Sequence, residues 1–487
     1  MKIKVCSKYL IAHDGTDHVI IHNGELVYQD DRVIFAGQHY DGEVDQTVDY
    51  GNAIVSPGFV DLNALADIDT TVMDYDQPGC VSDSQMWSVE YVRKGPHEIA
   101  SFEDEQFKFR YALTQLVMNG ITTALPVTGL QYKEWAETAK EFEGVRQSAV
   151  DLGLRVYLGP SFRSAVHTID ENGKTDRYWD ESKGMAGLED AAAFIQKNDN
   201  TCSDLVHGLL VPSTIETCSV PLLKKTREYA DQLNVPVRLH ATQSLRENRM
   251  IWNDFGCSPV GLLNRIGFLS SKTIIPHGIY IDVDKNGEPC DNGDLNTLRD
   301  TKAIIAYCPF ATARGGSIMK SYERYRRNGI RIGMGTDCYP SDMLMNLRLG
   351  SLLCRFVEGV SDIARSADIF RTATVGGADA LGRPDLGRLA EGTKADFFVL
   401  SLYGMHTGQV DDPVRTMLWY CNNTDIRTVV INGKTVMEDR KIPNVDNAEY
   451  QRKAQAYYDN FKRSYTERDR FHRPEEQIFP SGFRVIR

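Results

Sequence analysis

The sequence lacks any long apolar run. No stretch of its 487 residues approaches the roughly 18 to 20 consecutive apolar residues that span a membrane. The first fifteen residues, MKIKVCSKYLIAHDG, contain no apolar core of the kind that marks a signal peptide. We therefore expect a soluble, cytoplasmic protein with no membrane partner.

Paired cysteines and excess positive charge are also missing. The ten cysteines form no C-x-x-C pair, so we expect reduced thiols rather than a disulfide framework. Asp and Glu number 67 against 55 Lys and Arg, which gives a net charge of -12 and an isoelectric point near 5.5. Because nucleic acids and anionic membranes attract clustered positive charge, this balance argues against both and favours a small neutral or weakly polar molecule as partner.

What the sequence does contain is an alternation of short apolar runs with amphipathic stretches. The apolar runs read AIVSPGFVDL, GITTALPV, LRVYLGPSF, VHGLLVPS, PVRLHAT, TIIPHGIY, AIIAYCP and RIGMGTD. Between them, segments such as EDEQFKFRYALTQLVMN and PLLKKTREYADQL repeat apolar residues at three- and four-residue steps, as covering helices do. This alternation predicts an α/β fold, a (β/α)8 TIM-type barrel.

Both ends of the chain show a different pattern. HVIIHNGELVYQDDRVIFAGQ near the start, and DFFVLSL with IRTVVINGKTVMED near the end, alternate and turn like antiparallel hairpins. These two segments predict one small β-sandwich formed jointly by the two ends. We place the domains at residues 1–57 (first part of the sandwich), 58–387 (barrel), 388–440 (second part) and 441–487 (helical tail).

Three residues with metal-binding side chains each follow a predicted barrel strand. His240, His277 and Asp337 lie where the fifth, sixth and eighth predicted strands end, so their side chains should meet at one rim of the barrel. Two imidazoles and a carboxylate form a set that suits one divalent ion, with positions left open for water. Zinc is the favoured ion, and manganese, iron or cobalt also fit this set.

The chain resembles the amidohydrolase superfamily, in the branch of cytosine and guanine deaminases, s-triazine hydrolases and chlorohydrolases. The motifs that carry the resemblance are PGFVDL, GITTALP, HATQ, PHGIY, YCPFATARGGS and GMGTDCYPS, in order along nearly the whole chain. The resemblance implies a metal-dependent hydrolase that forms a homodimer or a higher homo-oligomer. It also implies that His240 and Asp337 are metal ligands or activate water, and that His277 is a ligand or an electrophile.

The sequence departs from this superfamily at three places. Relatives carry D-x-H-x-H on the first strand, whereas this chain keeps Asp61 but has Asn63 and Leu65 at the ligand positions. Leucine cannot coordinate a metal, while Asn63 either offers a weak oxygen ligand or simply packs. Deaminating relatives have a glutamate where Gln243 stands, and glutamine cannot transfer a proton. The segment LLVPSTIE lacks the lysine of binuclear relatives, so we expect one ion per chain.

Together these features predict a hydrolase that acts on a C–N bond, or on a C–Cl or C–S bond, of a small urea, carbamate, amide or heteroaromatic compound. His240 and His277 would be metal ligands, and Asp337 would be both ligand and general base. Asn63 and Gln243 would orient the water or the substrate. Two alternatives remain open: a catalytically inactive scaffold, or a lyase or cyclase on the same barrel.

Two long segments on the same side of the barrel, residues 67–100 and 163–186, are expected to cover the site. They contain aromatic and basic residues that would contact the substrate, among them Tyr75, Trp87, Arg163 and His167. Equally, the aromatic residues could form small cores of these loops. Cys308 and Cys338 also follow predicted strands, and we interpret both as packing residues.

Overall fold

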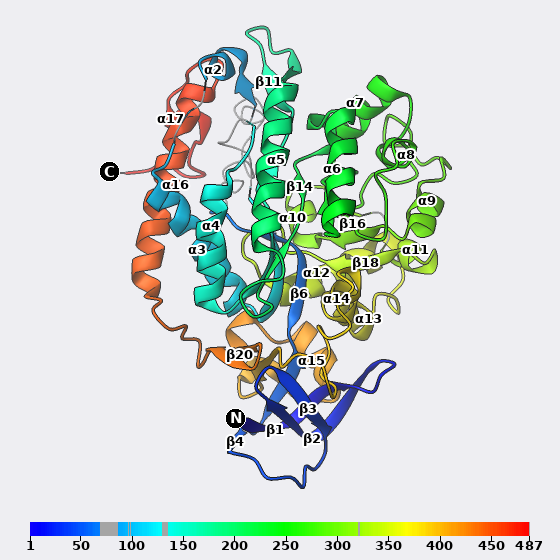
Figure 1. The fold of residues 1–487 in the computed structure, drawn as a ribbon, viewed down its shortest axis with the longest axis vertical. Coiled ribbons are helices and arrows are strands. Elements are labelled where there is room, and N and C mark those ends of the chain that lie inside the picture. The colour runs from blue at the N-terminus through cyan, green and yellow to red at the C-terminus, as the bar shows by residue number, and fades with distance from the viewer. Residues whose placement is uncertain (69–85, 96, 98, 129–134, 320–321, 487) are drawn as a thin grey trace.

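An eight-stranded parallel barrel lies above a small β-domain (Figure 1). This computed structural model describes residues 1–68, 86–95, 97, 99–128, 135–319 and 322–486. Tyr75 and much of the segment 67–100 lie outside the described residues. No helix in the described part of the chain is long and apolar enough to cross a membrane.

The barrel strands follow the predicted apolar runs. They are β6 (Phe59–Leu65), β8 (Ile121–Val127), β9 (Arg155–Leu158), β13 (Val206–Gly208), β15 (Val237–Arg238), β16 (Thr273–Pro276), β17 (Ile304–Tyr307) and β18 (Arg331–Met334). They pair in the order β13-β9-β8-β6-β18-β17-β16-β15, and a parallel bridge between Leu210 and Val237 closes the circle. The predicted (β/α)8 barrel is confirmed.

Amphipathic helices cover the outside of the barrel. They are α3 (Phe102–Met118), α4 (Ala139–Leu152), α5 (Glu181–Asn198), α6 (Val220–Leu233), α7 (Leu245–Phe255), α8 (Pro259–Arg265), α9 (Asp294–Thr301), α10 (Pro309–Arg314), α11 (Tyr322–Arg327), α12 (Met343–Glu358), α13 (Ser366–Ala373) and α14 (Val375–Ala380). Several begin at a side chain that caps free backbone N–H groups. At α4, for example, Thr138 and Glu141 form a reciprocal capping box.

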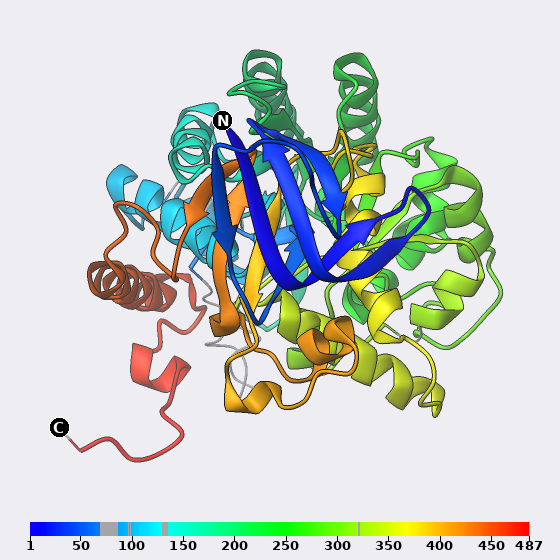
Figure 2. The same cartoon turned by 90° about the horizontal axis from the view of Figure 1, so that it is seen from below.

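Strands from both ends of the chain form one eight-stranded sheet, as predicted. They are β1 (Lys2–His13), β2 (His18–Gln29), β3 (Arg32–Gly37), β4 (Gln46–Asp49), β5 (Ala53–Pro57), β19 (Phe397–Ser401), β20 (Ile426–Ile431) and β21 (Lys434–Met437). β5 pairs with both β1 and β19, which joins the two terminal segments. Seen from below, this β-domain lies across one end of the barrel (Figure 2).

Two predicted elements differ from the structure. The run AIVSPGFVDL is not one strand, because β5 belongs to the β-domain and β6 to the barrel, with Gly58 between them. A Cβ on Gly58 would lie 2.1 Å from Thr122 Oγ1, so only glycine allows this close passage. Residues 163–186 are no simple loop: they form a hairpin of β11 (Ala165–Ile169) and β12 (Thr175–Trp179) and the start of α5.

Further elements complete the described chain. They are β7 (Trp87–Ser88), α2 (Val89–Arg93), β10 (Ser161–Phe162), β14 (Val211–Pro212), η2 (Ile215–Thr217), η3 (Met405–Thr407), α15 (Pro413–Trp419), η4 (Asn423–Asp425), α16 (Asn447–Arg468) and α17 (Glu475–Ile478). The helical tail packs against the barrel: Tyr457 of α16 is buried and donates a hydrogen bond to Glu105 of α3.

Candidate metal centre

His240, His277 and Asp337 lie together at the carboxyl ends of the barrel strands. They follow β15, β16 and β18, which places all three at the same rim. Asp337 Oδ1 is 3.9 Å from His240 Nε2, and Asp337 Oδ2 is 3.7 Å from His277 Nε2. In the part of the chain that the structure describes, one donor atom from each residue lies within 4.8 Å of the others. Residues far apart in sequence thus form one compact donor group.

Two of these three residues have a backbone conformation that is unusual for side chains with a Cβ. The φ angle is 74° at His277 and 60° at Asp337, both in the left-handed region. Backbone hydrogen bonds to neighbouring strands hold both positions: His277 N–H donates to Ala306, and Asp337 N–H donates to Asn63. Such backbone strain concentrates at functional sites, where surrounding structure maintains it.

Asn63 contacts the donor group directly. Its Nδ2 donates to Asp337 Oδ1 at 2.6 Å, and its backbone N–H donates to Asp61 Oδ1. Asp61 also accepts from both the backbone and the hydroxyl of Thr336, so it fixes the first and eighth strands together. Asn63 is fully buried, and its Oδ1 has no hydrogen-bond partner among the described residues. The geometry therefore gives Asn63 a positioning contact with Asp337.

Burial and neighbouring charges prepare the donor group for a cation. Burial lowers the pKa of His277 to about 4, so its ring is neutral at pH 7. Burial alone raises the pKa of Asp337, but His277, His240 and Arg238 outweigh it and hold this pKa below its usual value. Neutral imidazoles and an ionised carboxylate are the forms that bind metal.

A buried arginine below the donor group was missed by sequence reasoning. Arg238 is completely buried, and it donates to the carbonyl oxygens of Leu125 and Pro126 on β8. Burial lowers its pKa to about 10, so it keeps its positive charge at neutral pH. Its position two residues before His240, in the run PVRLHAT, was the available signal, because alternate residues of a barrel strand share one face.

The residues present fit a divalent ion. Two imidazole nitrogens and a carboxylate oxygen are a common protein set for zinc at catalytic sites, and open positions remain for water. Asp337 presents one carboxylate oxygen toward each histidine ring, at 3.9 and 3.7 Å, so the three side chains would hold an ion between them. Cys308 is buried near this set, with its Sγ 3.7 Å from Asn63 Nδ2.

Gln243 lies half-buried on the loop that follows His240. Glu247 holds this loop, because its two carboxylate oxygens accept from the backbone N–H groups of Thr242, at 2.6 Å, and Gln243, at 3.0 Å. Glu247 is fully buried, and burial raises its pKa well above the usual value. Ser244 and Glu247 follow the S-x-x-E capping pattern, a signal in the sequence that the prediction did not use.

The remaining predicted contact residues lie on the hairpin segment and beside it. His167 Nε2 is 3.1 Å from Glu216 Oε1, and burial lowers the pKa of His167. The guanidinium of Arg163 lies 5.9 Å from the centre of the Trp87 ring. Trp87 itself is buried in a small cluster with Tyr91, the arrangement expected of a loop core.

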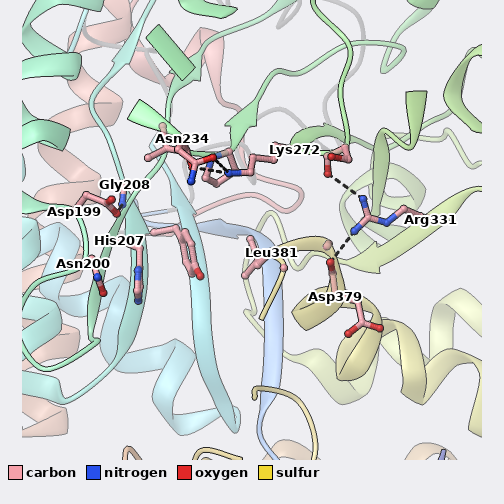
Figure 3. Close-up of a pocket in the computed structure, with 15 residues that line it drawn as sticks. Asp199, Asn200, His207, Gly208, Asn234, Lys272, Arg331, Asp379 and Leu381 are labelled. Atoms are coloured by element: carbon pink, nitrogen blue, oxygen red, sulfur yellow. Dashed lines mark hydrogen bonds between the residues drawn. The ribbon is translucent and has the colours of Figure 1, made fainter. Parts of the chain in front are cut away.

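A cavity of about 340 Å³ at the opposite end of the barrel lacks comparable chemistry (Figure 3). It is lined by residues that begin or precede the strands, including Arg331 and Lys272. Lys272 donates to Asn234, and Arg331 donates to the carbonyl oxygens of Ser271, Lys302 and Asp379. Since these cations already have partners, the cavity offers no reactive group like that at the rim.

Barrels with such a donor set at the carboxyl rim form the class of metal-dependent barrel hydrolases, and the fold and the site place the chain in that class. The chain belongs to the amidohydrolase family, whose sequence model matches residues 54–436. As predicted, it is an amidohydrolase-type enzyme.

The chain is similar to two 5-methylthioadenosine/S-adenosylhomocysteine deaminases. That of Pyrococcus abyssi is 27% identical over 445 residues, which cover 89% of this chain and 93% of the relative. That of Natronomonas pharaonis is 26% identical over 421 residues, which cover 85% and 88%.

Solved structures share the fold at lower identity. An adenosine deaminase from Xanthomonas campestris with bound zinc superposes with a TM-score of 0.75 at 17% identity, covering 94% of this chain and 98% of the other. The atrazine chlorohydrolase of Arthrobacter aurescens, complexed with zinc, superposes with a TM-score of 0.76 at 19% identity, covering 94% and 100%.

Proposed function

We propose that the chain is a mononuclear metal-dependent hydrolase that cleaves a C–N bond, or a C–Cl or C–S bond, of a small urea, carbamate, amide or heteroaromatic compound. The observation that carries the proposal is the convergence of His240, His277 and Asp337 within 4.8 Å at the carboxyl rim. When bound there, a divalent ion would act as a Lewis acid and lower the pKa of a water to about 7.

The chain's own residues have separate roles in this proposal. His240, His277 and Asp337 would hold the ion, and the Asp337 carboxylate would also accept a proton from the attacking water. Asn63 holds the Asp337 carboxylate through its 2.6 Å hydrogen bond and thereby sets the direction of proton transfer. We propose that Gln243 orients the substrate or the water by hydrogen bonding. We also propose that Arg163 and His167 form the substrate side of the site, with the buried Trp87 supporting Arg163 from behind.

One ion per chain follows from the residues that are absent. We propose that Asn63 and Leu65 occupy the positions where relatives carry first-strand histidines. The segment LLVPSTIE, which follows the fourth barrel strand, contains no lysine to bridge a second ion. Asn63 Oδ1 is the one additional oxygen that we assign to the ion, since it is buried without a hydrogen-bond partner among the described residues.

The similar deaminases suggest where to look for a substrate. By name, they act on 5-methylthioadenosine and S-adenosylhomocysteine. Gln243 cannot donate a proton to a departing amine, so we expect compounds with better leaving groups to react faster than these two nucleosides.

Metal analysis combined with a substrate panel tests the proposal. Protein loaded with zinc, manganese, iron or cobalt is expected to retain one ion per chain, and His240→Ala to retain none, because two remaining strong ligands hold a labile ion poorly. Release of amine, ammonia, chloride or thiol would be measured over ureas, carbamates, amides, chlorinated heteroaromatics and the two nucleosides. Two tightly bound ions would contradict the mononuclear site. If the protein showed neither bound metal nor activity on this panel, the proposal of a metal-dependent hydrolase would be overturned.

Gln243→Glu tests whether the glutamine limits deamination, because it introduces the carboxylate that deaminating relatives carry at this place. Gln455→Glu on α16 is the matched control. The first substitution restores a carboxylate beside His240 and is expected to raise ammonia release from aminated heteroaromatics relative to other substrates. An equal effect of both variants would show that Gln243 has no part in the reaction.

A further inference from the structure

Helix α12 has apolar residues on two opposite faces. Its inward face contributes buried residues to the barrel core: Met343, Leu344, Leu347, Gly350, Ser351 and Cys354. Its outward face carries Met345, Leu349, Leu352 and Phe356, spaced by four, three and four residues. We call these four residues the α12 stripe. Surface helices of globular proteins normally carry polar residues on the face away from the core, and a helix that is apolar all round is normally buried.

The exposure of this outward face is large for apolar side chains. Phe356 is 84% exposed and Leu352 is 47% exposed, and Val357 and Val360 beside them are 40% and 43% exposed. We call these four residues, of which Leu352 and Phe356 belong to the stripe, the α12 patch. They present roughly 400 Å², within the range of about 300 to 600 Å² for the largest, often functional, patch on a monomer. Water contact over such an area is unfavourable, so the patch favours burial against a partner.

We propose that the α12 stripe is the centre of a two-fold interface between two copies of this chain. Apolar residues spaced alternately by three and four residues line one side of a helix, which can pack against a second helix with the same spacing. The α12 of a second copy, related by two-fold symmetry, carries the same stripe. Rows of side chains on the surface of one helix form ridges that pack into the grooves of a second helix.

The distribution of charge also favours a second copy of the chain as the partner of the stripe. With a net charge of -12, two chains repel each other over most of their surface, but the α12 stripe contains no charged residue. The neighbouring arginines are bound within their own chain: Arg348 donates to the carbonyl oxygens of Leu418 and Cys421, and Arg355 donates to that of Ile363. The stripe can therefore meet its own copy without placing like charges together.

The area fits the centre of a dimer interface. A standard interface buries about 800 Å² per partner, with an apolar centre and a polar rim. The α12 patch supplies about half of that area as the apolar centre. Tyr420, which ends α15 and is 55% exposed, extends the patch on the side where Arg348 ties α12 to residues 418–421.

Sedimentation and light scattering over a wide concentration range test this interface. The wild-type chain is expected to show twice its 54.8 kDa mass. Phe356→Glu is expected to weaken dimerisation by at least ~100-fold, because it places a charge in a desolvated apolar centre on both copies. Phe483→Glu is the matched control, since Phe483 is 93% exposed on the tail and far from α12 in sequence; it should remain dimeric.

Circular dichroism melting of each variant would establish that it folds, and Leu352→Lys provides a second variant should Phe356→Glu fail to fold. A wild-type chain that is monomeric at every concentration would overturn the proposal and assign the patch to another partner. A dimer that persists in both α12 variants, or that dissociates equally in Phe483→Glu, would also overturn it. None of these outcomes depends on the proposed catalytic function.

Discussion

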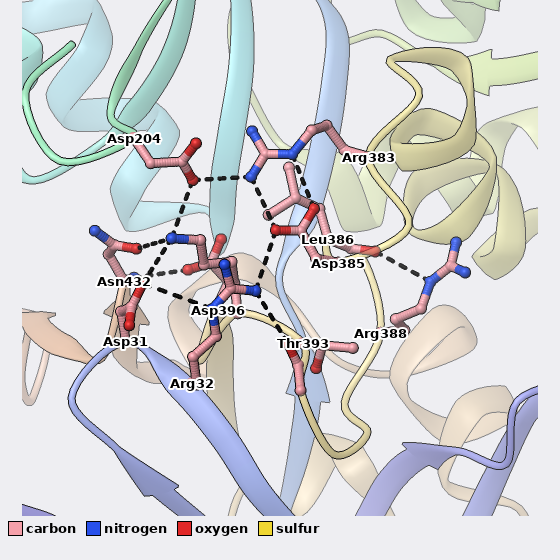
Figure 4. A network of polar contacts seen from close by, with 12 residues as sticks. Asp31, Arg32, Asp204, Arg383, Asp385, Leu386, Arg388, Thr393, Asp396 and Asn432 are labelled. Carbon is pink, nitrogen blue, oxygen red and sulfur yellow. Dashed lines mark hydrogen bonds and ion pairs between the residues drawn. The ribbon is translucent and has the colours of Figure 1, made fainter. Parts of the chain in front are cut away.

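The two ends of the barrel satisfy their charges in opposite ways. At the end facing the β-domain, Arg155 is completely buried and pairs with both Asp204 and Asp396. Asp204 also pairs with Arg383 (Figure 4). Lys394 pairs with Asp204 and Asp31 and so extends the network to the β-domain. Oppositely charged groups meet there at hydrogen-bond distance, and strands from three regions of the sequence are held together.

At the carboxyl rim, by contrast, Asp337 accepts a hydrogen bond from Asn63 but lies farther from the two histidine rings. Asp337 lies 3.9 and 3.7 Å from the two histidine rings, longer than a hydrogen bond, and two of the three residues have left-handed backbones. One end of the barrel therefore supplies stability, while the other keeps reactive groups available for a ligand. In (β/α)8 enzymes this division leaves loops at the carboxyl end free to vary in chemistry.

The largest expected effect is on stability, from breaking the buried network. Arg155→Met leaves Asp204 and Asp396 without their buried partner and is expected to lower the free energy of unfolding by ~3 to 5 kcal/mol. Urea denaturation measures this loss, and metal content of the folded protein should not change. Arg415→Met is the control: its pair with Asp411 is exposed, and such pairs contribute at most about 1 kcal/mol. Equal losses in the two variants would contradict the structural role of the network.

The second effect is catalytic and belongs to the rim. Asp337→Asn removes the group proposed to accept the proton and is expected to reduce turnover by at least ~10²-fold. Steady-state kinetics measure it on the best substrate of the panel. Asp379→Asn, beside the cavity at the opposite end, is the matched control and should leave turnover unchanged. A normal rate in Asp337→Asn would show that another residue is the base.

A smaller effect is expected from the residue that positions Asp337. Asn63→Ala removes the hydrogen bond to Asp337 Oδ1, and the loss of such a supporting contact typically weakens metal binding by ~10- to 100-fold. Competition with a chelator would measure the affinity. Asn432→Ala, in the network at the opposite end, should leave it unchanged. If Asn63→Ala binds metal as the wild type does, the asparagine only packs.

The smallest effect concerns acid stability. Burial alone raises the pKa values of Asp204 and Asp385, but hydrogen bonds from His207 to Asp204 and from Arg383 to both carboxylates outweigh it, and both pKa values lie below normal. Their contribution is therefore present above the unfolded-state pKa of about 3.9 and is lost as pH falls below it. Urea denaturation would measure the free energy of unfolding at neutral pH and at about pH 3. The loss between the two pH values should be smaller in Arg383→Met than in the wild type, by an amount on the order of 1 kcal/mol. An unchanged slope would contradict this linkage.

Local sequence patterns predicted most of the fold, and fewer details of the site. Apolar runs and helical periodicity located the eight strands because buried parallel strands need continuous apolar sequence. The same reasoning could not divide AIVSPGFVDL into two strands, because the division depends on pairing with two different sheets, β5 with β1 and β19, and β6 with β8 and β18. It also predicted a loop at residues 163–186, where pairing between β11 and β12 forms a hairpin.

The amino-acid sequence by itself determined the barrel, the joining of its two ends into one β-domain and the identity of the candidate metal-binding side chains, since these depend on periodicity and on residues that end strands. Tertiary structure alone decided what surrounds those side chains. The hydrogen bond from Asn63 to Asp337 and those from Arg238 to the carbonyl oxygens of Leu125 and Pro126 join different strands. Long-range contacts of this kind have no local sequence signal, because they arise only when the closed barrel brings distant strand ends to one rim.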